Sequence, residues 1–129
     1  ISVPLEFLMG AVKKRCTAFL MSDFIDENDY KNALTIANRK HDLVAIQVYD
    51  KRMEELPDTG LMKVLDAETG QSIYLDTSSK AVRTAHRRWF EENRARIKDT
   101  LTRSRVDSIS IRTDQDYVKA LMDLFAKRN

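Results

Sequence analysis

Three short apolar runs, separated by segments with helical periodicity, most constrain what this chain can fold into. The runs are residues 16–21, 43–49 and 106–111, and their β-branched and aromatic residues favour strands. The first two are nearly continuous in hydrophobicity, which is typical of strands covered on both faces of a parallel sheet. The third alternates from Asp107 onward, as at an edge. Strands that alternate with helices predict an α/β fold with three layers and a mostly parallel, open sheet.

Four segments around these runs carry mostly apolar residues at helical spacing. The residues of each pattern are Leu5, Leu8, Met9 and Val12; Tyr30, Ala33, Leu34 and Ala37; Val82, Trp89, Asn93, Ile97 and Leu101; and Tyr117, Val118, Leu121, Met122 and Phe125. We expect Trp89 to anchor its helix in the core. Thr113, with Asp116 three residues on, predicts a capping box at the start of the last helix.

One segment breaks the alternation of strands and helices. Residues 61–65 and 72–76 flank a polar stretch that includes Gly70, which is available for a positive φ. This pattern predicts an inserted β-hairpin over residues 61–76, preceded by a turn at residues 57–60. The hairpin extends the edge of the sheet or forms a surface flap. No linker divides the chain, so it is one domain or a piece of one.

Composition agrees with a packed core under a polar surface, because 43% of residues are hydrophobic and 33% are charged. No apolar run approaches the roughly 20 residues that span a bilayer, so no membrane segment and a cytoplasmic location are expected. A membrane anchor upstream of Ile1 in a parent protein stays open. Cys16 is the single cysteine and cannot form an internal disulfide. We expect it to be a small buried hydrophobe without a histidine partner.

The first run leads into an acidic corner, which we define as residues 22–26. Ligands bind outside the carboxyl ends of the strands in open parallel sheets, and Asp23 lies at such an end. Mg²⁺ prefers oxygen ligands, so Asp23 is a candidate metal ligand and Ser22 a weaker one with its hydroxyl. A purely structural role for Asp23 is the open alternative. Asp26, Glu27 and Asp29 are expected to cap the following helix and to favour its positive end.

Several segments, in order, resemble the domain of unknown function number fifty-eight, a family that is similar to von Willebrand factor A domains. The segments that carry the resemblance are Ser22-Asp23-Phe24-Ile25-Asp26 and residues 37–46, 55–61, 66–70, 76–78, 109–114 and 117–118. The resemblance implies a doubly wound sheet with helices on both faces. It also implies that residues 1–129 form the C-terminal half of an A-like domain and hold its fourth, fifth and sixth strands.

The resemblance further implies a metal-ion-dependent adhesion site. In A domains this site combines an Asp-x-Ser-x-Ser loop, a Thr from a later loop and an Asp after the fourth strand. Asp23 matches the last part, whereas Asp-x-Ser-x-Ser has no match in the chain. The site is therefore expected to be incomplete here. The chain alone is expected to hold no cofactor, and Mg²⁺ or another divalent cation would bind only in the full-length protein.

The same layout places the first strand of the domain beside residues 16–21. Without that neighbour, the run has an unpaired apolar edge, and such edges recruit other strands. We therefore predict a homodimer or a swapped segment through this edge.

The resemblance also implies a partner, because members of the family are associated with MoxR-type AAA+ ATPases in assembling or maturing other proteins. The favoured hypothesis is a non-catalytic protein-interaction module, and the chain is not expected to be an enzyme. The rival is a metal-dependent hydrolase or phosphoryl-transfer enzyme that uses the acidic corner. It would need further carboxylates to converge on Asp23.

The segment from Lys80 to Arg105 is strongly basic, with nine positive and three negative side chains. Such a face can bind nucleic acid, which is a second alternative. A solvated amphipathic helix is the favoured interpretation, because Glu91 and Glu92 lie within pairing distance of neighbouring arginines. Nucleic-acid binding is therefore not expected. His41 and His86 lack a catalytic partner in the sequence, and both are expected to be structural.

Overall fold

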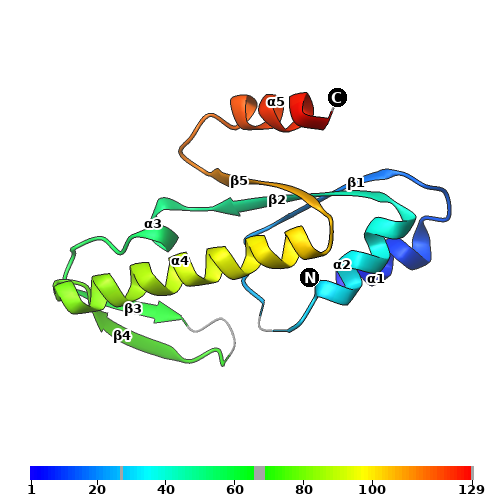
Figure 1. Cartoon of the computed structure of the whole chain (residues 1–129). Coiled ribbons are helices and arrows are strands. Elements are labelled where there is room, and N and C mark those ends of the chain that lie inside the picture. Colours follow the sequence, from blue (N-terminus) through cyan, green and yellow to red (C-terminus); the bar gives the residue numbers. More distant parts are fainter. Residues whose placement is uncertain (27, 66–68, 129) are drawn as a thin grey trace.

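Helices and strands alternate along most of the chain in the computed structural model, which describes residues 1–26, 28–65 and 69–128 (Figure 1). The elements are α1 (Ser2–Ala11), β1 (Thr17–Ser22), α2 (Lys31–Lys40), β2 (Asp42–Tyr49), α3 (Lys51–Glu54), β3 (Leu61–Leu65), β4 (Ser72–Asp76), α4 (Lys80–Arg103), β5 (Asp107–Arg112) and α5 (Tyr117–Arg128). The short helix α3 was not expected from the sequence. Asp50 caps it by accepting a hydrogen bond from the backbone N–H of Arg52, at 2.8 Å.

Strands β1, β2 and β5 form a three-stranded parallel sheet in the order β1-β2-β5. Each begins and ends within one residue of the predicted run, so the α/β fold with a mostly parallel sheet is confirmed. Strand β2 lies in the middle, where Val44 pairs with Phe19 on one side and Ile46 pairs with Ile109 on the other. Its continuous apolar run suits this position because both of its faces are covered.

Strands β3 and β4 form a separate antiparallel hairpin at the predicted residues. Gly70 has a φ of +69°, as the predicted loop requires, and residues 66–68 of that loop lie outside the described residues. The fully buried Thr77 closes the base of the hairpin, because its N–H and its hydroxyl both donate to the carbonyl of Gly60. The hairpin lies below the amino-terminal half of α4 (Figure 1), so it is a flap and does not extend the parallel sheet.

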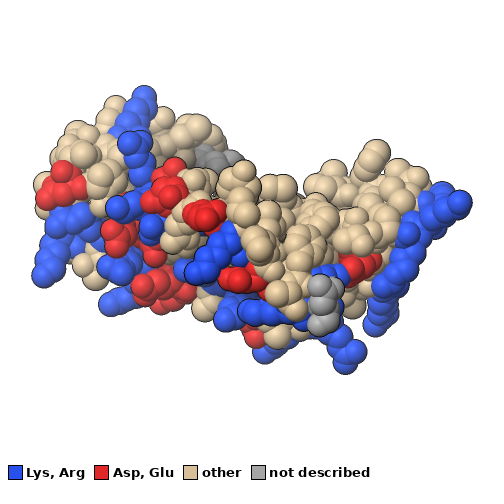
Figure 2. Space-filling model, turned by 90° about the horizontal axis from the view of Figure 1, so that it is seen from above, with Lys and Arg blue, Asp and Glu red and all other residues tan. Residues whose placement is uncertain are grey.

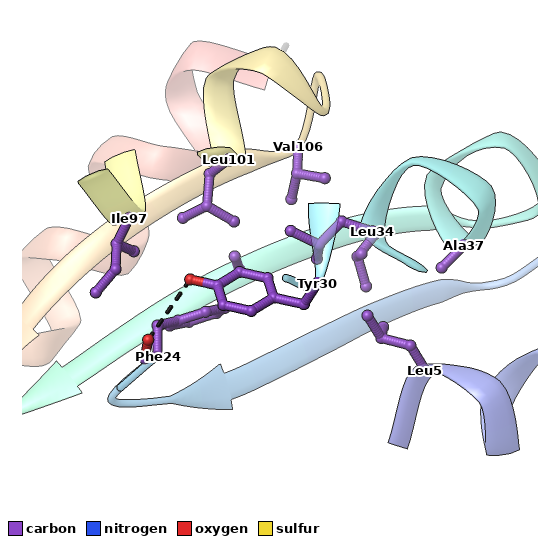
Figure 3. Packing of buried hydrophobic residues seen from close by; sticks show 10 residues of the cluster. Leu5, Phe24, Tyr30, Leu34, Ala37, Ile97, Leu101 and Val106 are labelled. Atoms are coloured by element: carbon purple, nitrogen blue, oxygen red, sulfur yellow. Dashed lines mark hydrogen bonds between the residues drawn. The ribbon is translucent and has the colours of Figure 1, made fainter. Parts of the chain in front are cut away.

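Helices cover both faces of the parallel sheet (Figure 1). Helices α1, α2 and α4 lie on one face, and α5 packs near β5 on the other. The main core forms under the first group (Figure 3), and its buried members are Leu5, Phe24, Tyr30, Leu34, Ala37, Leu43, Ala45, Ile97, Leu101 and Val106. Burial of each large aliphatic side chain contributes about 1.5–3 kcal/mol, so this cluster is the main source of stability.

The long helix α4 turns a different residue inward than the sequence predicted. Phe90, Ile97 and Leu101 are its buried residues, whereas Trp89 is 46% exposed. The expectation that Trp89 anchors the core is therefore wrong. The Phe90 ring lies 5.4 Å from the Tyr49 ring at the end of β2, which fixes the phase of the helix.

Helix α5 also differs from its prediction. It begins at Tyr117, where Asp116 accepts a hydrogen bond from the N–H of Val118, so Asp116 and not Thr113 caps it. The N–H of Thr113 instead donates to the carbonyl of Tyr49. Leu124 is the buried residue of α5, and most of the predicted inward face is exposed, namely Tyr117, Val118, Met122 and Phe125.

Arg128 fastens the end of α5 to the amino ends of two strands. Its guanidinium donates to Asp42 at the start of β2 and to Asp107 at the start of β5. The hydrogen bond with Asp42 is the main cause that raises the pKa of Arg128. These contacts hold the end of α5 at the sheet, although Leu124 is the one buried residue of that helix among the described residues.

Candidate functional site

The acidic corner lies where β1 ends and the chain turns sharply. Ser22 Oγ accepts a hydrogen bond from the N–H of Phe24 at 3.0 Å, and Asp23 Oδ1 accepts one from the N–H of Ile25 at 2.9 Å. Phe24 has a φ of +59° and is almost fully buried against Tyr30. This turn leaves the Asp23 side chain exposed at the carboxyl end of the strand, where the sequence placed it.

Asp29 lies at the start of α2 as the sequence predicted, whereas Asp26 bonds elsewhere and does not cap that helix. Asp29 accepts a hydrogen bond from the N–H of Lys31, the first residue of α2. Asp26 accepts from the amino group of Ile1 and from the N–H of Asn28, and these contacts lower the pKa of Asp26. Glu27 lies outside the described residues.

The structure does not bring these carboxylates together around one point. Asp26 and Asp29 border a hollow of about 230 Å³ that also contains Arg96 of α4, and Asp23 lies outside it. Within residues 1–26, 28–65 and 69–128, no group of three His, Cys, Asp or Glu side chains is placed to hold a metal ion. Asp23 and Ser22 thus offer two neighbouring oxygen ligands at most, and a complete cation site requires further ligands from elsewhere.

A second polar hollow lies at the carboxyl ends of β2 and β5, and the sequence reasoning missed it. Its volume is about 480 Å³, and it contains Asp50 after β2 together with Thr113 and Asp114 after β5. Arg112 donates to Asp114, and this hydrogen bond is the main cause that raises the pKa of Arg112. The rule that selected Asp23, a polar residue directly after a strand, would also have selected Asp50 and Thr113.

Cys16 and His41 lie in contact, which corrects the expectation that neither has such a partner. His41 Nδ1 accepts a hydrogen bond from the N–H of Cys16 at 3.1 Å, and the Cys16 sulfur lies 3.4 Å from the same nitrogen. The backbone N–H thus occupies the lone pair that would take the thiol proton. The buried imidazole therefore carries its hydrogen on Nε2, which has no partner among the described residues.

Large apolar side chains remain exposed where β1 and α5 meet. The rings of Phe19 and Phe125 pack edge to face at 6.2 Å, yet the two residues are 47% and 45% exposed. Within the described residues β1 pairs only with β2, so its outer edge is open. We define the β1–α5 surface by its exposed apolar residues, which are Phe19, Met21, Val118, Met122 and Phe125.

The α5 side of the molecule shows how charge is distributed (Figure 2). Uncharged atoms cover much of the area between a half with mixed blue and red side chains and a blue end. That end corresponds in Figure 1 to the connection between α1 and β1, which carries the exposed Lys13, Lys14 and Arg15.

Part of the basic charge of α4 is neutralised by carboxylates of other segments. Arg83 lies 3.5 Å from Asp58, and Arg87 lies 3.4 Å from Glu55. Both carboxylates belong to the connection between α3 and the hairpin, which the sequence did not place beside α4. These contacts agree with the interpretation of α4 as a solvated amphipathic helix.

Comparisons with known proteins give one family and several uncharacterized relatives. A family model described as "Protein of unknown function DUF58" matches residues 1–96. Uncharacterized proteins of Mycobacterium tuberculosis (strain ATCC 25618 / H37Rv) and Mycobacterium bovis are each 28% identical over 130 residues, with 99% of this chain and 40% of the relative covered. An uncharacterized protein of Mycobacterium avium is 26% identical over 128 residues, with 99% of this chain and 75% of the relative covered.

Among solved structures, an uncharacterized membrane spanning protein from Vibrio fischeri matches with a TM-score of 0.36 and 12% identity. The match covers 95% of this chain and 51% of that one. Among the helices of the described residues, none has the length and apolar character that crossing a membrane requires. The chain spans 40% of the length of the first mycobacterial relatives.

Proposed function

The chain belongs to the family described as Protein of unknown function DUF58, and on that premise we propose that it is a non-catalytic protein-interaction module. We propose that it works with a MoxR-type AAA+ ATPase in the assembly or maturation of other proteins. The chain covers 40% of the first mycobacterial relatives, so the activity and partners of the whole protein are part of this proposal.

The β1–α5 surface is the observation that carries the proposal. Met21 and Met122 are 66% and 67% exposed, and the aromatic pair of Phe19 and Phe125 lies with them on the same side of the sheet. Contiguous exposed apolar side chains of this size mark interaction surfaces in soluble domains. Methionine is also common on surfaces that adapt to a protein partner.

We also propose that the chain is the C-terminal half of a von Willebrand factor A-like domain. The parallel order β1-β2-β5, with helices on both faces, supports this because it agrees with the fourth, fifth and sixth strands of such a domain. In that arrangement the first strand of the domain would pair with β1.

In the intact protein, we propose that Asp23 binds Mg²⁺ or another divalent cation, with Ser22 beside it. Support comes from the position of Asp23 at the carboxyl end of β1 and from its exposure. One of its two oxygens, Oδ1, accepts the hydrogen bond from Ile25, which orients the carboxylate. The remaining ligands would come from outside this chain, and a partner carboxylate would complete the coordination.

Calorimetric titration of the intact protein with MnCl₂ tests the metal proposal. The Asp23→Asn variant keeps an oxygen for the Ile25 N–H but loses the charge, so we expect its affinity to fall by about tenfold or more. Asp123→Asn is the matched control, because Asp123 is an exposed residue of α5 far along the chain. Equal affinity of the Asp23→Asn variant and the unmodified protein would remove Asp23 from the site.

Capture of a purified MoxR-type ATPase by the immobilised intact protein tests the partner. We expect Met122→Glu to weaken capture by about tenfold or more, because it places a charge among the exposed apolar residues of the β1–α5 surface. Leu65→Glu is the control, since Leu65 is 66% exposed on the hairpin. Hydrolysis of phosphoesters that depends on Asp23 would contradict the proposal and favour the metal-dependent enzyme instead.

A further inference from the structure

The free edge of β5 borders a groove that the proposed function does not use. Within the described residues β5 pairs only with β2, so its other edge is open. A hollow of about 470 Å³ lies between this edge and α4. Its polar lining comes from three elements: Gln47 of β2; Glu91, Arg94 and Lys98 of α4; and Ser108 and Ser110 of β5. We call this hollow the β5 groove.

The dimensions of the β5 groove suit an extended chain. In a parallel strand, alternate residues turn their N–H and C=O groups to opposite sides, so half of those in β5 face the open edge. The lining residues of α4 run from Glu91 to Leu101, a distance of about 15 Å along the helix axis. An added strand rises about 3.3 Å per residue, so four or five residues fit beside β5.

The side of the β5 groove that α4 forms is positively charged. Arg94 and Lys98 are exposed and lie one helical turn apart, and neither has a carboxylate within salt-bridge distance among the described residues. Glu91, the acidic lining residue, is directed to Arg87 at 3.4 Å. The guanidinium of Arg94 lies 5.4 Å from the centroid of the Tyr49 ring, which holds it over the sheet.

A buried carboxamide forms part of the groove floor. Gln47 is 6% exposed, and its Oε1 accepts a hydrogen bond from Ser110 Oγ at 2.7 Å. Its Nε2 has no hydrogen-bond partner among the described residues. This amide can donate a hydrogen bond to an oxygen that enters the groove.

We propose that the β5 groove binds an extended acidic segment of a partner protein, which adds to the sheet beside β5. Side chains alternate along a strand, so Asp or Glu at every second position would face Arg94 and Lys98, and the backbone would pair with β5. Nucleic acid could meet the cations but has no backbone that pairs with a strand. The inference rests on the proposed interaction function and names the chemistry of one segment that the module recognises.

Fluorescence anisotropy with labelled hexapeptides tests the groove in the intact protein. An alternating Thr-Glu peptide should bind at least about tenfold more tightly than an alternating Thr-Lys peptide. Two further Thr-Glu peptides carry N-methyl groups on the backbone nitrogens of the odd or of the even residues. The one that loses the N–H groups facing β5 should not bind, because it cannot pair as a strand. Equal binding of the Glu and Lys peptides, undiminished binding of both methylated peptides, or stronger binding of a dT oligonucleotide would overturn the proposal.

Charge reversal identifies the residues. The double variant Arg94→Glu and Lys98→Glu should lose at least about tenfold in affinity for the Thr-Glu peptide. The control, Arg88→Glu with Lys63→Glu, changes charge equally at exposed positions outside the groove. Hydrogen exchange on the unmodified protein needs no variant, and residues 107–112 should exchange more slowly when the Thr-Glu peptide is present. Unchanged exchange there, or equal losses in both double variants, would contradict the groove.

The two proposals fail separately. Peptide binding that persists in a protein unable to capture the ATPase supports the β5 groove and overturns only the named partner. Capture of the ATPase by a protein that binds no peptide at millimolar concentration overturns only the groove.

Discussion

Tyr30 joins the acidic corner to the core through a single side chain (Figure 3). Its ring lies 6.1 Å from the Phe24 ring, and its hydroxyl donates to the Phe24 carbonyl at 3.5 Å. Burial raises the pKa of Tyr30, and the negative charges of Asp26 and Asp29 raise it further. The phenol therefore stays protonated in the folded protein at pH values where it ionises in the unfolded chain.

This difference predicts a loss of stability at alkaline pH. The unfolded phenol ionises near its ordinary pKa of 10, and the folded one ionises only at higher pH, so the stabilising effect is complete below pH 10 and is lost as the pH rises through the folded pKa. Urea unfolding between pH 9 and about 11 should show a steeper fall in the free energy of unfolding for the unmodified protein than for Tyr30→Phe. Parallel pH profiles would contradict a raised pKa.

Residue roles that depend on neighbours in the sequence could be predicted, and those that depend on distant residues could not. Asp29 caps the next helix because its partner, Lys31, lies two residues on. Cys16 and His41 are 25 residues apart, and they meet only because β1 begins where α2 ends. Short sequence motifs relate residues a few positions apart, whereas a strand and a helix separate these two residues. The contact was therefore missed.

At the scale of elements, the strands were predictable because continuous hydrophobicity is a local property of the chain. β2 coincides with its predicted run within one residue, and the hairpin strands β3 and β4 coincide with theirs. Helix phases were harder to predict, since two neighbouring aromatic residues both fit a helical pattern. In α4, Phe90 and not Trp89 is buried, because the Phe90 ring packs against the ring of Tyr49.

Alanine substitutions distinguish the two aromatic residues of α4. Phe90→Ala leaves a cavity beside Tyr49, so we expect it to lower the free energy of unfolding by about 3–5 kcal/mol. Trp89→Ala removes a half-exposed ring beside His86, and we expect a loss of less than about 1 kcal/mol. The midpoints of denaturant unfolding measure both losses, provided that the dependence of the unfolding free energy on denaturant concentration stays the same. A larger loss from Trp89→Ala would restore the core role that the sequence first indicated.

At the scale of the whole molecule, the candidate site was only partly predictable. The position of Asp23 beyond β1 follows from the sequence, because a parallel sheet presents strand ends along one edge. The β1–α5 surface could not be derived, since it depends on which face α5 turns inward. The β5 groove required three elements to be placed together, and the sequence indicated no position for α4 relative to β2 and β5.

The open edge of β1 predicts self-association. Phe19 and Met21 flank that edge, so a second strand can bury them and pair with the free backbone groups. Light scattering of this chain at high concentration should show a dimer, and Met21→Lys should shift the equilibrium to monomer. A monomer at all concentrations would contradict the prediction.

The insertion of the hairpin and α4 between β2 and β5 also affects the order in which the strands pair during folding. Phe19 and its partner Val44 are 25 residues apart, whereas Ile46 and its partner Ile109 are 63 apart. Closing the longer loop costs about 0.8 kcal/mol more entropy, from (3/2)RT ln(63/25). We therefore expect β1 and β2 to pair early in folding and β5 to join last, an order that pulse-labelled hydrogen exchange would reveal or refute. During synthesis, β1 and β2 would therefore form a two-stranded intermediate that persists until β5 has left the ribosome.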